Sequence, residues 1–65
     1  MVTTKAKSII EMAIKHKDYV KLARCVDAMR FDYGMNYNQI AKFAQDKCGI
    51  PVMEWDQYMM ECDRV

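Results

Sequence analysis

The sequence predicts an all-α protein, a compact bundle of three to four short helices that forms a single helical domain over residues 1–65. Apolar residues recur at helical spacing in four segments, at about residues 4–16, 18–31, 37–48 and 52–63. Residues that begin or end helices separate these segments. Of the 65 residues, 52% are hydrophobic and 29% are charged, which suits one small domain with a thin core.

The first predicted helix, at about residues 4–16, carries its apolar side chains on one face. Those residues are Ala6, Ile9, Ile10, Ala13 and Ile14. Thr3 or Thr4 is expected to cap the helix, because a hydroxyl oxygen can accept a hydrogen bond from a backbone N–H of the first turn. Residues 16–18 either separate this helix from the second or continue both as one long helix.

The second predicted helix has Asp18 as its N-cap and continues to about Phe31. Its buried stripe is expected to contain Tyr19, Leu22, Ala23, Val26 and Met29. A flanking face consists of Val20, Arg24, Asp27 and Phe31. We interpret this face as a second contact with the core, since a middle helix of a bundle has neighbours on both sides, and the alternative is a docking surface.

The third predicted helix has the clearest boundaries. Asn36 and Gln39 form a capping-box pattern, and Met35 and Ile40 supply the accompanying hydrophobic staple. Gly49 is expected to end the helix in a left-handed conformation, before the proline at position 51. The buried stripe is expected to contain Tyr37, Ile40, Ala41, Ala44 and Cys48.

The last predicted helix begins at Pro51 or Val52 and continues to about Asp63. Its core side is expected to contain Val52, Trp55, Met59 and Cys62, with Tyr58 at the edge. Trp55 is expected to contribute the largest buried area of any single residue.

Charges and cysteines limit the environment and the chemistry. Residues 1–30 have a net charge of +4 and residues 31–65 a net charge of −3. Three widely spaced cysteines and the lack of an apolar segment after Met1 argue against a secreted disulfide framework, so we expect a cytoplasmic protein. His16 and the cysteines match no zinc-binding spacing, and two glycines make no phosphate-binding loop. We therefore expect no catalytic residues, no metal site, no cofactor and no membrane span.

Residues 36–63 resemble a helix-turn-helix motif, because Asn36-Tyr-Asn-Gln-Ile-Ala-Lys-Phe-Ala is followed by a glycine-containing turn and another helix. The resemblance implies DNA binding through the last helix. The sequence departs from the family pattern because Gly49 comes about four residues late and because residues 52–63 contain acids but no lysine or arginine. The nucleic-acid-binding residues expected instead, through phosphate contacts, are Lys7, Lys15, Lys17, Lys21 and Arg24.

The acidic last helix predicts a different use. At about 100° per residue, Met53 and Met60 lie opposite Trp55 and Met59. Flexible, polarizable methionine side chains with a charged rim are typical of adaptable protein-docking surfaces. The predicted partner-binding residues are Met53, Glu54, Asp56, Gln57, Met60, Glu61 and Asp63.

These patterns favour a small, non-catalytic accessory protein that regulates or inhibits a larger protein or complex, including one that handles DNA or RNA. One alternative is a helix-turn-helix regulator that binds DNA directly. The other is a structural subunit that only self-associates, and a homo-oligomer is compatible with each of these hypotheses.

Overall fold

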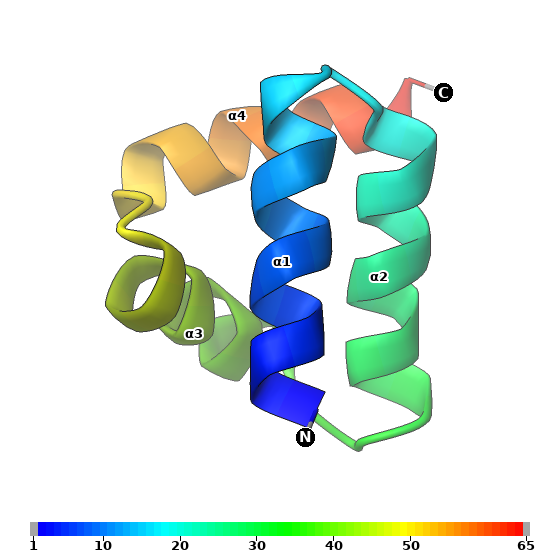
Figure 1. The fold of residues 1–65 in the computed structure, drawn as a ribbon, viewed down its shortest axis with the longest axis vertical. Helices are drawn as coiled ribbons and strands as arrows, with labels where there is room; N and C mark the ends of the chain where they lie inside the picture. Colours follow the sequence, from blue (N-terminus) through cyan, green and yellow to red (C-terminus); the bar gives the residue numbers. More distant parts are fainter. Residues whose placement is uncertain (1, 65) are drawn as a thin grey trace.

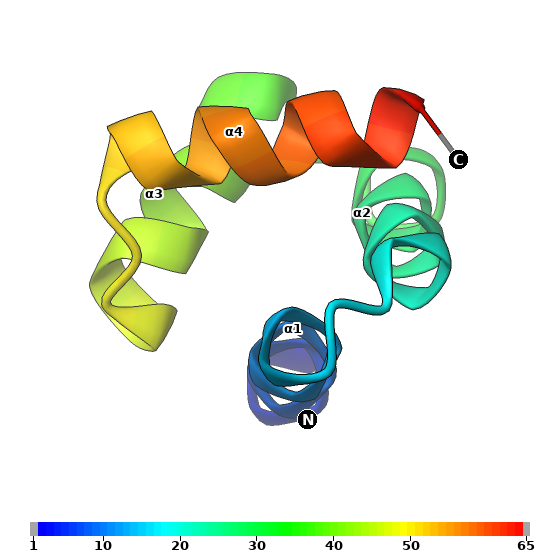
Figure 2. The same ribbon diagram turned by 90° about the horizontal axis from the view of Figure 1, so that it is seen from above.

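The residues that the structure describes form four helices: α1 (Val2–Lys15), α2 (Tyr19–Phe31), α3 (Tyr37–Cys48) and α4 (Val52–Asp63). The computed structural model describes residues 2–64, and this part contains no strand. Helices α1 and α2 run antiparallel, with α3 and α4 packed behind them (Figure 1). Figure 2 shows α4 on the opposite side of the molecule from α1. The Cα radius of gyration of 10.5 Å is close to the roughly 11 Å expected for a folded chain of this length, and the predicted all-α bundle is confirmed.

A tight turn separates α1 from α2, which the sequence had left open. The N–H of Asp18 donates to the carbonyl of Ala13 at 2.8 Å, and the N–H of Lys17 donates to that of Ile14 at 3.2 Å. This pair of bonds is a Schellman motif, with Lys17 at φ 55° in the left-handed position that usually holds glycine. The Asp18 carboxylate then accepts from the backbone N–H of Lys21 at 3.1 Å, so Asp18 caps α2 as predicted.

The start of α1 differs from the prediction. The helix begins at Val2, so both Thr3 and Thr4 lie inside it and neither can be its N-cap. No glycine or proline stands in residues 2–4, and helical hydrogen bonding therefore continues past the expected boundary.

The ends of α3 agree with the prediction. The side chain of Asn36 accepts from the N–H of Gln39 at 2.8 Å, and the Gln39 side chain accepts from the N–H of Asn36 at 2.9 Å, which completes the capping box. Gly49 adopts the left-handed conformation at φ 68° and ψ 27°. The N–H of Ile50 binds the carbonyl of Ala44 at 3.1 Å. The chain therefore leaves α3 where the glycine allows it to turn.

The core lies between the four helices. Its buried members are Ala6, Ile10, Ala13, Leu22, Cys25, Val26, Met29, Ile40, Ala41, Ala44 and Trp55. Tyr37 and Val52, both expected in the core, are 44% and 45% exposed. Each is the first residue of its helix, where the rest of the bundle covers the side chain only in part.

The outer face of α2 is also more exposed than predicted. Val20, Arg24, Asp27 and Phe31 are all exposed, so the interpretation of this face as a second core contact is wrong. The physical reason is visible in Figure 2, where the other three helices lie on one side of α2. No helix within residues 2–64 is long and apolar enough to cross a membrane.

Candidate docking surface

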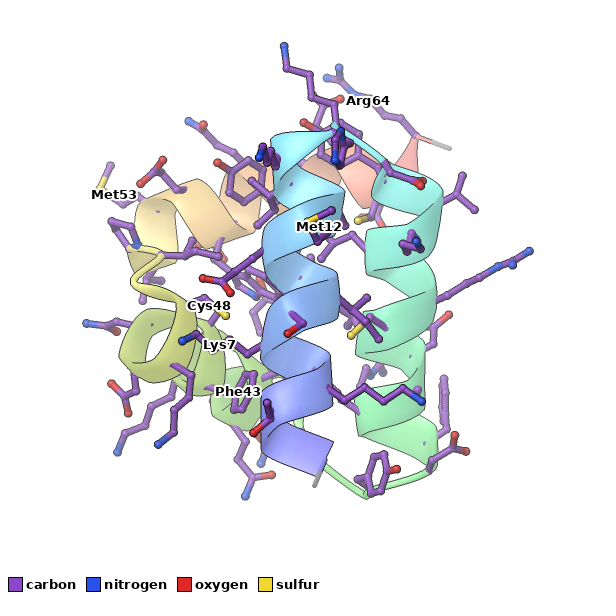
Figure 3. All side chains as sticks on the ribbon, viewed as in Figure 1. Lys7, Met12, Phe43, Cys48, Met53 and Arg64 are labelled. Carbon is purple, nitrogen blue, oxygen red and sulfur yellow. The ribbon has the colours of Figure 1, made fainter. Side chains whose placement is uncertain are left out.

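The outer face of α4 carries two exposed methionines. Met53 is 80% exposed and Met60 is 59% exposed. They are seven residues apart, which places them on the same side of the helix and about 10 Å apart along its axis. Figure 3 shows Met53 pointing away from the bundle at the start of α4. We call Met53, Gln57, Met60 and Glu61 the outer face of α4.

The opposite side of α4 faces the core. Trp55 is fully buried, and Tyr58, Met59 and Cys62 pack against the core as half-buried residues. The Cys62 thiol donates to the carbonyl of Tyr19 at 3.5 Å, which joins α4 to the start of α2. These inward residues hold α4 against the bundle and leave its outer face exposed to solvent.

The predicted acidic residues of α4 do not all lie on its outer face. Asp56 turns toward α3, where its carboxylate accepts a hydrogen bond from the Tyr37 hydroxyl at 2.7 Å. Burial, followed by the hydrogen bond and the negative charge of Asp56, raises the pKa of Tyr37 to about 12. Asp63 lines a hollow of about 400 Å³ beside Arg30 and Tyr37. These two carboxylates therefore form one edge of the surface, while exposed Glu54 and half-buried Glu61 lie along its opposite edge.

One basic residue joins this surface, and the sequence analysis missed it. Arg64 follows Met60 by four residues, which is the spacing of neighbours on one helical face and could have revealed it. Its guanidinium Nη1 lies 3.5 Å from Oε1 of Glu61. The side chain of Arg64 is 73% exposed and that of Glu61 is 44% exposed, so water screens the pair; it contributes little stability but partly neutralises the acidic end of α4.

The predicted nucleic-acid-binding residues do not form one surface. Lys21 and Arg24 line a groove between α1 and α2 together with Lys5, which the sequence analysis did not single out. Lys7 lies on the side of α1 that faces α3, near Cys48 (Figure 3). Lys15 ends α1 and Lys17 occupies the following turn.

The three cysteines contribute to packing. Cys25 is buried, Cys48 and Cys62 are half-buried, and all three are free thiols. Burial raises the pKa of each thiol, so the reactive thiolate form is disfavoured near neutral pH. Within residues 2–64, no three histidine, cysteine or carboxylate side chains are grouped closely enough to hold a metal ion.

In comparisons with known proteins, no family model matches this sequence, and no curated protein or solved structure shows significant similarity to it.

Proposed function

We propose that this protein is a non-catalytic binding protein that regulates or inhibits a larger protein or complex by docking the outer face of α4 on it. The observation that carries the proposal is the exposure of Met53 and Met60 on one side of a helix whose other side is held by a buried tryptophan. Burying one such methionine in an apolar contact is worth about 1.5–3 kcal/mol. Two of them supply a central apolar contact for a specific interface.

The charges of α4 favour a target with a basic surface. Glu54, Asp56 and Asp63 are exposed around the two methionines. Complementary charges speed association and reject acidic surfaces. A groove that binds DNA or RNA is basic. We therefore favour a target protein or complex that handles nucleic acid.

Direct DNA binding through α4 is less favourable electrostatically. The helix-turn-helix resemblance would place α4 in the major groove, where Glu54 and Asp56 would approach phosphates. The negative carboxylates would repel the negative phosphates, whereas a recognition helix needs lysine or arginine. The same carboxylates that oppose DNA support contact with a basic protein.

A pull-down from cell lysate tests the proposal. Three versions of the purified protein serve as bait, each with and without nuclease. The versions are wild type, Met53→Glu/Met60→Glu, and the control Val20→Glu/Phe31→Glu, which places the same charge on the exposed face of α2. We expect one discrete protein with wild type and the α2 control, and at least tenfold less with the α4 variant. The purified target should reproduce that ratio in a direct titration.

Two results would contradict the proposal. Capture that depends on the α2 face and not on α4 would move the docking surface to α2. Recovery of nucleic acid alone, sensitive to salt and indifferent to the α4 variant, would favour the DNA-binding alternative. Circular dichroism of each variant shows that its helices are intact.

A further inference from the structure

A second surface lies between α1 and α2, away from α4. It is an open groove with a volume of about 340 Å³. Its apolar lining consists of Ala6, Ile9, Cys25, Ala28 and Met29. Alanine at two of these positions leaves room between the helices that a larger side chain would fill.

The edges of this groove are mainly cationic. Lys5, Lys21 and Arg24 line it, against a single carboxylate from Asp32. An apolar floor between positive charges is complementary to an apolar side chain flanked by carboxylates. The ligand class that this groove fits is therefore an acidic amphipathic helix with unbranched apolar side chains.

The protein carries such a helix itself. Along α2 the groove is lined from Lys21 to Met29, which is about 12 Å at the helical rise per residue, and Asp32 and Tyr33 continue the lining beyond the end of the helix. Met53 and Met60 lie about 10 Å apart along the axis of α4, which fits within this length. The outer face of α4 offers Met53 and Met60 as two protruding side chains, with Glu54 among the acids around them. The groove and the methionine side of α4 therefore match in length, apolar content and charge.

We infer that α4 of one copy docks in the α1–α2 groove of a second copy. Figure 2 shows α4 on the opposite side of the molecule from α1, whereas the groove lies between α1 and α2, so one copy can use both surfaces at once. Such a contact joins two different patches and is head-to-tail, which builds chains or closed rings rather than a symmetric dimer. It also covers the outer face of α4, so self-association competes with the target of the proposed function.

Complementary loss-of-contact variants test this arrangement. Met53→Glu/Met60→Glu removes the apolar side chains that enter the groove but leaves the groove intact. Lys21→Glu/Arg24→Glu reverses the charge of the groove but leaves α4 intact. Both pairs are exposed, so the fold should survive, and circular dichroism checks this. Sedimentation velocity then measures the mass of each protein over a range of concentrations.

We expect the wild-type mass to rise with concentration and to fall as salt is added. Each variant alone should remain a monomer. An equimolar mixture of the two should form a 1:1 dimer of twice the monomer mass, because one intact groove meets one intact α4. A symmetric contact of α4 with α4 cannot give this result, because every mixed pair would carry one damaged α4, and the groove variant, whose α4 is intact, would dimerise by itself.

Three outcomes would overturn the inference: a wild type that stays monomeric, a groove variant that still associates like wild type, or a mixture that remains monomeric. Failure of the proposed function would be seen in a different measurement. The groove variant retains α4 and should still capture the target, whereas a missing target would leave the mass measurements unchanged.

Discussion

Helices α2 and α4 are nearly equal in length, at 13 and 12 residues, but they are attached to the bundle in different ways. The side chains that α2 buries are Leu22, Cys25, Val26 and Met29. Trp55 alone is fully buried from α4, which also begins without a side-chain cap. With one fully buried side chain and a few half-buried ones, α4 keeps its outer face exposed, and this is the face that we propose as a docking surface.

The turns that precede the two helices differ in backbone strain, and the strained turn precedes the helix that buries more side chains. The firmly packed α2 follows Lys17, which adopts a left-handed conformation at φ 55°. The lightly packed α4 follows Gly49, which adopts a similar φ of 68° with no side chain to oppose it. The strained turn therefore precedes the helix that buries four side chains, and the unstrained turn precedes the helix that buries one.

The largest expected effect comes from removing the anchor of α4. Trp55→Ala should cost about 3–5 kcal/mol, because it leaves a cavity where the largest core side chain stood. A domain of this size is rarely more stable than that, so we expect the variant to lose its cooperative thermal transition by circular dichroism.

Trp55→Phe is the matched control for that experiment. Within residues 2–64 the indole N–H of Trp55 has no hydrogen-bond partner, and phenylalanine removes this unsatisfied donor while filling much of the space. This variant should stay folded. A cooperative transition near the wild-type midpoint for Trp55→Ala would show that α4 is not held by Trp55.

A smaller effect is expected at the two turns, with opposite signs. Lys17→Gly should stabilise the fold by about 1 kcal/mol, because glycine adopts positive φ without a steric penalty. Gly49→Ala should destabilise it by about 1–2 kcal/mol through the backbone alone, since no atom lies within 4 Å of an added Cβ. Urea denaturation measures both. Lys17→Ala keeps the strain, and an equal gain from that variant would trace the effect to charge instead.

The smallest effect concerns the bond that joins α4 to α3. Tyr37→Phe removes the hydroxyl that donates to Asp56, and at this solvated site we expect a loss of about 0.5 kcal/mol. The folded state favours the neutral phenol, because the pKa of Tyr37 is raised from 10.0 to about 12. The difference between wild type and variant should therefore be complete below pH 10 and disappear as the pH rises through 12. Denaturation at several pH values checks this, and a difference that grows with pH would contradict the assigned contact.

Much of the fold follows from local patterns. The Asn36–Gln39 capping box, the Asp18 cap and the left-handed Gly49 are each made by residues within a few positions of one another, so their signals are present in the sequence. The exposure of Met53 and Met60 also followed from helical spacing relative to Trp55.

The predictions about surfaces that were wrong or incomplete have a common origin. Helical periodicity gives the direction of a side chain around its own axis but not which directions neighbouring helices cover. Val20 and Phe31 share a plausible second face of α2, yet the other helices pack on one side only. Lys5 joins Lys21 and Arg24 in one groove because α1 and α2 pack together there.

The sequence by itself determined the four helices, most of their ends and the side of α4 that carries the exposed methionines, because these depend on interactions within one or two helical turns. Only the tertiary structure decided that α2 has an uncovered outer face, that Tyr37 binds Asp56, and that an apolar groove with cationic edges lies between α1 and α2. Each of these joins residues far apart in the chain, and their proximity depends on how the helices pack.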